Sequence, residues 1–176
     1  MRVFARDPFA DPAPLIRRVY SYVAYRIGNG ADAEDITSEV FERALRYRAS
    51  FDGSREPAPW LLGIARRCVD DALAQRRPTA QMEAGEQASA EDVESEAVDR
   101  ITLANAIERL DERSRDLLAL RYGADLSARE IGRILGMKPN AVDVALHRAL
   151  GKVRTELAGW DESRLRTAAS EHGIAR

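Results

Sequence analysis

The chain has 176 residues, of which 45% are hydrophobic and 32% are charged, and its formal net charge is −2. This is the composition of an ordinary globular protein, and it excludes a strongly basic chain that binds nucleic acid through net charge alone. A single cysteine excludes an internal disulfide, and His147 and His172 have no Cys or His partners at metal-ligand spacing. We therefore predict no metal site and no cofactor. The N-terminus has no apolar run of signal-peptide length and no segment is apolar enough to span a bilayer, so we expect a cytoplasmic protein without membrane insertion.

The charges are distributed unevenly along the chain. Residues 1–78 hold 13 basic and 11 acidic side chains, and residues 100–158 hold 11 basic and 8 acidic ones. Residues 79–99 hold 7 acidic side chains and no basic one. Two mildly basic lobes therefore flank an acidic segment.

We expect three helices behind a loose arm in the first half of the chain. Residues 1–14 are rich in proline and aspartate and predict no regular element. The first helix spans 15–27 and ends at a Gly28-Asn29-Gly30 run. Its apolar residues at helical spacing are Ile16, Val19, Tyr20 and Val23.

The second helix is expected from about Ala33 to about Arg48, with Asp32 as its N-cap. Residues 49–58 predict a loop, and Pro59 opens a third helix that reaches about Arg77. Cys68 lies on the apolar side of this third helix, which indicates a small core residue.

The second helix has an unusual polar side. Its inward face is expected to hold Ile36, Val40 and Ala44, extended by Phe41. Nearly opposite lies an acidic stripe of three residues, Asp35, Glu39 and Glu42. Like charges one turn apart destabilise an isolated helix, so the stripe suggests a basic surface on a partner. The alternative is a plain solvated face.

Aromatic and basic residues occur together around the start of the third helix. The helix carries Trp60, and we expect Arg66 and Arg67 to point outward. The preceding loop contains Phe51, Asp52, Ser54 and Arg55. Aromatic rings beside arginines can stack on unpaired bases while the arginines hold phosphates. The alternative is that Trp60 only fills the core, and a stacking function requires it to be partly exposed.

The second half of the chain predicts a helix-turn-helix after an acidic linker. Residues 79–97 have a linker composition, and helices are expected at 98–110 and 111–122. Ser127 and Glu130 form a capping box, Gly136 ends that helix, and Pro139 opens the next one, which runs to about Leu157.

The helix after Pro139 has an apolar and a polar face. The apolar face is expected to hold Val142, Ala145, Leu146, Ala149 and Val153. Base and phosphate contacts are expected from the other face and its flanks, at Lys138, Asn140, Asp143, Val144, His147, Arg148 and Lys152. An ordinary helical hairpin is the alternative.

The expected fold class is all-α, because no strand pattern occurs. Two small helical domains are joined by a flexible acidic linker, and the C-terminal domain contains the helix-turn-helix. The predicted parts are an arm at 1–14, a domain at 15–78, a linker at 79–97, a domain at 98–158 and a tail at 159–176.

Three motifs in fixed order resemble one protein family. AEDITSEVF, then PWLLGIARR, then LDERSRDLLALRY before the helix-turn-helix are similar to bacterial RNA polymerase sigma factors of the sigma-70 family, in the extracytoplasmic-function (ECF) group. The resemblance covers about residues 10–157. It implies a specificity subunit that is not itself an enzyme. It also implies three partners: core RNA polymerase, promoter DNA and an anti-sigma protein.

The resemblance assigns a function to each group of candidate residues. Asp35, Glu39 and Glu42 would dock on the polymerase. The loop residues Phe51, Asp52, Ser54 and Arg55, with Trp60, Arg66 and Arg67, would recognise and melt the −10 element, and the helix from Pro139 would read the −35 element. Asp143 departs from the basic residues common in such recognition helices. Two alternatives remain: a free-standing helix-turn-helix regulator, and an adaptor that binds polymerase or an anti-sigma protein without reading DNA.

Overall fold

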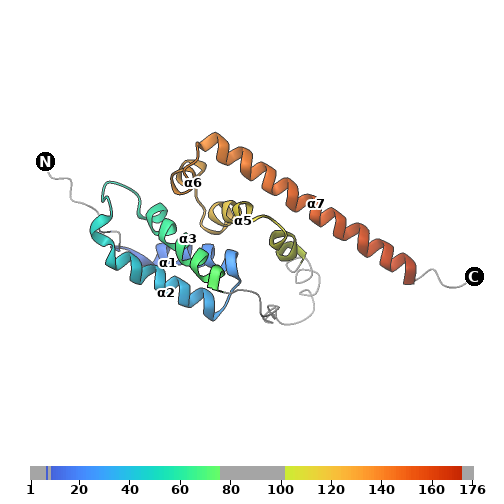
Figure 1. Cartoon of the computed structure of the whole chain (residues 1–176), viewed down its shortest axis with the longest axis horizontal. Helices are drawn as coiled ribbons and strands as arrows, with labels where there is room; N and C mark the ends of the chain where they lie inside the picture. Colours follow the sequence, from blue (N-terminus) through green and yellow to red (C-terminus); the bar gives the residue numbers. More distant parts are fainter. Residues whose placement is uncertain (1–6, 8, 76–101, 172–176) are drawn as a thin grey trace, which may run out of the picture. The chain divides into compact units, whose positions relative to one another are not determined.

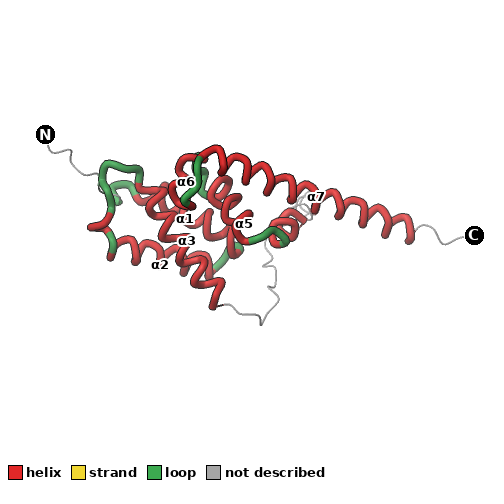
Figure 2. The backbone as a smooth tube through the Cα atoms, turned by 45° about the horizontal axis from the view of Figure 1, so that its top comes forward, coloured by secondary structure: helices red, strands yellow, loops and turns green. Residues whose placement is uncertain are grey.

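The computed structural model describes residues 7, 9–75 and 102–171, with side chains described as far as Gly159. Within these ranges the chain forms helices and connecting loops and no strand, as Figure 1 and Figure 2 show. The all-α prediction is therefore confirmed. The predicted acidic linker at 79–97, half of the predicted arm and the end of the predicted tail lie outside the described residues. The described part of the arm corrects its predicted end at residue 14, because the first helix already begins at Pro12.

The chain divides into two compact units that do not follow sequence order. Unit 1 comprises Met1–Gly85 and Asp116–Asp143, and unit 2 comprises Glu86–Arg115 and Val144–Arg176. Residues from the middle of the predicted second domain thus pack with the predicted first domain.

Three helices form the first part of unit 1: α1 (Pro12–Ile27), α2 (Ala31–Arg46) and α3 (Pro57–Gln75), and each packs against the other two. The inward residues expected on α2 are confirmed, because Ile36, Val40 and Ala44 are buried. The α3 core includes Leu61, Leu62, Ala65, Cys68 and Val69, so the prediction for the cysteine is also confirmed.

The apolar stripe of α1 coincides only in part with the face that the helix buries. Ile16 is 44% exposed, whereas Leu15, Val19, Tyr22, Val23 and Arg26 are buried. Tyr22 and Arg26 lie one turn apart on α1. Both face inward because both contact the Asp116 carboxylate inside unit 1. Apolar periodicity could not find this face, since it counts only apolar residues.

The start of α2 also differs from the prediction. Gly30, with φ of 120°, is the N-cap, and its carbonyl accepts hydrogen bonds from the Ala33 and Glu34 amides. Asp32 is not the cap: it lies inside the first turn, where a carboxylate favours the positive end of the helix dipole. A short 3-10 turn, η1 (Arg48–Ser50), follows α2, and α3 begins two residues before the predicted Pro59.

The second half of the described chain is also helical. Residues 102–108 form a helix, followed by α5 (Glu112–Leu118), a π-helical turn η2 (Ala119–Gly123), α6 (Ala128–Leu135) and α7 (Pro139–Glu171). Helix α7 continues well beyond the predicted end at Leu157. A lone glycine in a helix costs only about 1 kcal/mol, so Gly159 does not stop it.

The predicted helix-turn-helix signals are confirmed at α6 and the start of α7. The Ser127 hydroxyl accepts from the Glu130 amide at 3.3 Å, and the Glu130 carboxylate accepts from the Ser127 amide at 2.8 Å. Gly136 has φ of 65°, a left-handed conformation that glycine adopts without strain, and α7 begins at Pro139.

Gly132 makes the turn possible, and its replacement by alanine is expected to destabilise the protein by about 1–3 kcal/mol. A Cβ at this position would lie 2.5 Å from the Met137 carbonyl oxygen, which is backbone and cannot move aside. Gly63→Ala is the control, since nothing lies within 4 Å of its added Cβ, and it should stabilise α3 by about 0.5–1 kcal/mol. Urea unfolding measures the free energy of unfolding of both variants. Equal changes for Gly132→Ala and Gly63→Ala would contradict the turn geometry.

Candidate nucleic-acid interface

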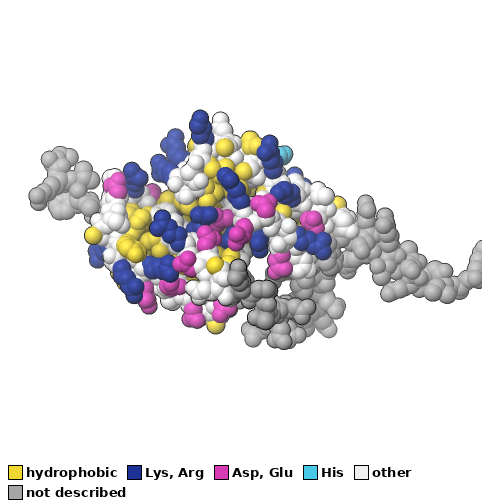
Figure 3. Space-filling model, in the orientation of Figure 1, with side chains coloured by type: hydrophobic (Ala, Val, Ile, Leu, Met, Phe, Trp, Pro, Cys, Tyr) yellow, Lys and Arg dark blue, Asp and Glu magenta, His cyan; other side chains and the backbone are white. Residues whose placement is uncertain are grey.

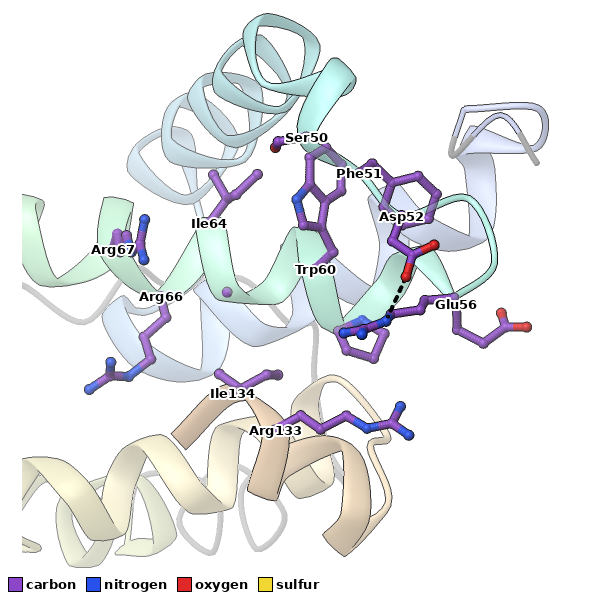
Figure 4. Close-up of a pocket in the computed structure, with 13 residues that line it drawn as sticks. Ser50, Phe51, Asp52, Glu56, Trp60, Ile64, Arg66, Arg67, Arg133 and Ile134 are labelled. Carbon is purple, nitrogen blue, oxygen red and sulfur yellow. Dashed lines mark ion pairs between the residues drawn. The ribbon is translucent and has the colours of Figure 1, made fainter. Parts of the chain in front are cut away.

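The loop between η1 and α3 forms one wall of a cavity of about 440 Å³ in unit 1. The rings of Phe51 and Trp60 lie against each other there, with centroids 5.1 Å apart and planes inclined by 50°. Arg133 and Ile134 of α6 line the cavity opposite the α3 residues, as Figure 4 shows. Such a volume is typical of small-ligand sites.

Asp52 organises the loop. Its carboxylate accepts hydrogen bonds from the Ser54 amide at 3.1 Å and the Ser54 hydroxyl at 2.7 Å, and it pairs with Arg55 at 2.9 Å. These contacts, led by the Ser54 hydroxyl, lower the pKa of Asp52 below its usual value. Three of the predicted loop residues therefore hold the loop beside the Phe51–Trp60 pair, rather than pointing into solvent independently.

The two predicted arginines of α3 are placed differently. Arg67 is exposed, and the described residues include no ion pair to it. The outward prediction for Arg66 is only partly right: its side chain is 40% exposed, but its Nε donates to the Asp116 carboxylate at 2.6 Å and its guanidinium lies 3.8 Å from Asp70. Trp60 is only half-buried, so it meets the exposure that stacking requires.

A buried polar cluster around Asp116 was missed from sequence. The Tyr22 hydroxyl donates to this carboxylate at 2.6 Å, and the Arg26 guanidinium approaches it to 3.9 Å. Burial and the charge of Asp116 both raise the pKa of Tyr22, so this hydroxyl remains a hydrogen-bond donor. The signals were a tyrosine and an arginine at i and i+4, and an aspartate within an otherwise apolar stretch of 116–120.

The acidic stripe on α2 is exposed at Asp35 and Glu42 and partly buried at Glu39. Glu39 pairs with Arg43 at 2.6 Å and Glu42 with Arg46 at 3.8 Å, both at i, i+4. Arg43 also donates to Asp71 at 3.0 Å. These pairs explain how α2 tolerates the stripe, because each contributes a few tenths of a kcal/mol. Asp35 has no ion pair within the described residues.

The polar face of α7 is as predicted. Val142, Leu146, Ala149 and Val153 are buried, whereas Ala145 is only partly so. The candidate −35 residues Lys138, Asn140, Asp143, Val144, His147, Arg148 and Lys152 are all exposed. Lys152 is not free, because its ammonium donates to Asp111 at 2.7 Å. Asp111 also accepts from the Ser114 amide as the cap of α5, and these bonds, led by Lys152, hold its pKa well below its usual value.

Charge does not gather into one basic patch on the face drawn in Figure 3. Lys and Arg side chains alternate with Asp and Glu, and exposed hydrophobic side chains lie among them. No group of His, Cys, Asp or Glu among the described residues could hold a metal ion. No described helix is long and apolar enough to cross a membrane.

Cys68 should be inert in the folded protein. Burial raises the pKa of its thiol to about 11, and the thiolate is the reactive form. At pH 8 we expect iodoacetamide to label the native chain at least about tenfold more slowly than the chain in guanidinium, where the thiol has its ordinary pKa of about 8.5. Mass spectrometry reads the single cysteine directly; equal labelling rates would contradict its burial.

The fold and its surfaces define a class: an all-α protein with a helix-turn-helix and an aromatic pocket lined by arginines. Two family models match the chain, Sigma-70 region 2 at residues 14–79 and Sigma-70, region 4 at residues 100–153. The chain belongs to the sigma-70 family of RNA polymerase sigma factors, in its ECF group.

Curated relatives agree with this membership. The chain is 34% identical over 140 residues to the ECF RNA polymerase sigma factor BldN of Streptomyces coelicolor, matching 75% of this chain and 53% of that protein. It is 32% identical to the RNA polymerase sigma factor CarQ of Myxococcus xanthus, over 87% of this chain and 88% of that one. It is 30% identical to SigW of Bacillus subtilis, over 86% and 90%. The chain thus spans about half of BldN but nearly all of the other two.

Solved structures share the fold. CnrH, in complex with the cytosolic domain of CnrY, matches with a TM-score of 0.60 and 21% identity, over 84% of this chain and 82% of that one. The sigma factor RpoE of Bartonella quintana, in complex with the anti-sigma factor NepR, matches with a TM-score of 0.65 and 14% identity, over 84% and 94%.

Proposed function

We propose that this sigma factor binds core RNA polymerase and directs promoter-specific initiation by reading the −35 element and by recognising and melting the −10 element. Family membership supports this, together with one structural observation: the half-buried Trp60 against Phe51 in a cavity rimmed by arginines. An ordinary DNA-reading regulator would need only the helix-turn-helix. The aromatic pocket supports a second DNA contact, to unpaired bases.

The pocket suits an unstacked base. Extruding a base from a duplex costs a few kcal/mol, and stacking on an aromatic ring returns about 1–3 kcal/mol per base. Trp60 would stack on the base, Asp52 and Ser54 would hold the loop, and Arg55 and Arg67 would approach the backbone phosphates. The Arg66 side chain is 40% exposed, but its Nε becomes available only after its bond to Asp116 breaks.

The exposed face of α7 would read the −35 element. Arg148 and Lys138 supply cations, Asn140 and His147 supply hydrogen bonds, and Val144 supplies an apolar contact suited to a thymine methyl group. Asp143 would accept from a cytosine amino group. The few cations on this face imply weak DNA binding by the isolated chain and strong dependence on polymerase.

The acidic stripe would dock on core polymerase. Exposed i, i+4 pairs contribute little, so Arg43 and Arg46 can release Glu39 and Glu42 to cations of the partner. Asp35 is available directly. The proposed boundaries are 15–78 for the polymerase and −10 domain and 98–158 for the −35 domain. A cytoplasmic location and an anti-sigma partner complete the proposal; the solved relatives CnrH and RpoE were captured with CnrY and NepR.

Run-off transcription with purified core polymerase tests the proposal, and Arg148→Ala tests the −35 surface within it. Loss of one guanine-reading arginine costs about 1–3 kcal/mol, so we expect promoter-specific product to fall about 5- to 150-fold. Exposed Arg129→Ala on α6 is the control. Sequence-specific DNA binding by the chain in the absence of polymerase, with no promoter-specific run-off product, would support the free-standing regulator. Unchanged output for Arg148→Ala would support the adaptor that does not read DNA.

A further inference from the structure

The residues just before α1 form a turn that packs on α2 and η1. The Asp7 carboxylate accepts a hydrogen bond from the Phe9 amide at 3.0 Å, and the Asp7 carbonyl accepts one from the Ala10 amide at 3.2 Å. An aspartate that bonds the backbone two residues further on is typical of an Asx turn. The region 2 family match begins at residue 14, so this turn is a feature of the chain outside that match.

The side chains of this turn hold Arg48, the first residue of η1, from two sides. Asp7 pairs with the Arg48 guanidinium at 2.8 Å, and the same guanidinium lies over the Phe9 ring, 5.9 Å from its centroid. The Phe9 ring in turn lies against the Phe41 ring of α2, with centroids 6.4 Å apart and planes inclined by 55°. We call these four residues (Asp7, Phe9, Phe41 and Arg48) the arm contact.

The side chains of η1 have no core packing of their own. None of its three residues is buried, and among the described residues Asp7 is the only ion-pair partner of Arg48. An exposed ion pair contributes little by itself. Here, however, the guanidinium also lies over an aromatic ring that is itself packed on α2, so the contacts support one another. The arm contact therefore ties the exposed η1 turn to the body of α2.

The backbone carries this restraint into the aromatic pocket. The Arg48 carbonyl accepts from the Phe51 amide at 3.1 Å, and the Tyr47 carbonyl accepts from the Ser50 amide at 2.8 Å and from the Ser50 hydroxyl at 2.7 Å. Ser50 and Phe51 line the cavity, where the Phe51 ring lies against Trp60 (Figure 4). A shift of η1 would therefore move Phe51 relative to Trp60, because the tryptophan is held separately on α3.

We propose that Asp7 and Phe9 are positioning residues for promoter opening. They hold η1 through Arg48, and η1 in turn keeps Phe51 beside Trp60 in the arrangement that receives an unstacked base. This inference rests on the proposed function of the pocket. None of the four residues of the arm contact belongs to the acidic stripe, so the contact acts on promoter opening and not on core binding.

Trp60 fluorescence tests the coupling in the chain alone, without polymerase or DNA. The sequence has two tryptophans, so Trp160→Phe leaves Trp60 as the single emitter. In that background Phe9→Ala should raise the acrylamide quenching constant of Trp60 about twofold, because a displaced Phe51 uncovers one face of the indole. Phe9→Tyr retains a ring in the arm contact and should give the quenching constant of the parent chain.

Ile16→Ala is the matched control, because it removes a hydrophobic side chain of α1 that is 44% exposed and lies outside the arm contact. It should leave the quenching constant at the parent value. Arg48→Ala breaks the contact from its other side, at a side chain that is 53% exposed and whose loss leaves the core intact. Added to Phe9→Ala it should change quenching little further, since both variants break the same contact. Parent-like quenching in folded Phe9→Ala or Arg48→Ala chains would overturn the proposal.

Permanganate reactivity of unpaired thymines then measures promoter opening at saturating core polymerase. Phe9→Ala should reduce opening about 3- to 10-fold, whereas Phe9→Tyr should open the promoter like the native chain. The dissociation constant for core should change less than about twofold. Each variant is assayed well below its thermal midpoint, so that a loss of stability alone does not lower opening.

The two assays separate failure of this inference from failure of the proposed function. Native opening by a folded Phe9→Ala chain would contradict a positioning function for the arm. If the native chain itself opens no promoter with active core, the proposed function fails, whereas the quenching of Trp60 still decides whether the arm contact holds the pocket.

Discussion

Reversing the charge of Asp35 and Glu42 together is expected to weaken binding to core RNA polymerase by about 100-fold. Both carboxylates are exposed on one side of α2. Lysines there would face the cations that the proposed partner surface must carry, and like charges brought together in an interface cost several kcal/mol. A 100-fold change corresponds to about 3 kcal/mol. Fluorescence anisotropy of a labelled chain titrated with core enzyme measures the dissociation constant.

The control for this charge reversal changes net charge equally on other surfaces. Asp11→Lys with Glu108→Lys alters two exposed acids that lie outside α2. It should shift the dissociation constant less than about threefold, through long-range charge alone. If both double variants lose affinity to the same extent, general electrostatics rather than a docking stripe attaches the chain to polymerase.

The second large effect is expected from Trp60→Ala, which should reduce promoter opening about 5- to 150-fold. The loss corresponds to the roughly 1–3 kcal/mol that one base gains by stacking on an aromatic ring. Core binding should be unchanged, because Trp60 lies on the loop and α3 wall of the cavity (Figure 4) rather than on the α2 stripe. Permanganate reactivity of unpaired thymines near −10 measures opening directly.

Trp60→Phe distinguishes stacking from packing. Phenylalanine retains a ring that can stack and can still contact Phe51, so opening should stay within about fivefold of native. Thermal unfolding of both variants separates any loss of stability from loss of opening. Native opening rates for a folded Trp60→Ala chain would show that the tryptophan only fills the wall of the cavity.

Local chemistry was enough to predict several elements correctly. The capping box at Ser127, the left-handed Gly136 and the first-turn Pro139 each act on neighbouring backbone groups, so they operate whatever packs around them. The all-α fold class and the family motifs were equally readable, because helical periodicity and motif order are properties of the chain itself.

Predictions failed where side chains meet partners distant in sequence. Ile16 belongs to the apolar stripe of α1 but is 44% exposed, because α1 turns Tyr22 and Arg26 toward Asp116, about ninety residues away. Arg66 was expected to face solvent, and its side chain is 40% exposed, but its Nε also bonds the same carboxylate. The residue spacing along α1 and α3 does not predict that Asp116 is the partner of these side chains.

The sequence by itself determined the helices, the helix-turn-helix and the family, since these depend on local backbone chemistry and on motifs read in order. Only the tertiary structure decided that Asp116–Asp143 packs with the first three helices, that Arg133 and Ile134 share a cavity with Trp60, and that Gly123 touches α1. The physical reason is that burial of a charge depends on what surrounds it in space. From sequence alone, the polar and charged groups around Asp116 would be assigned to the solvated surface. They form a buried cluster only because α1 and α3 pack against the segment that begins at Asp116.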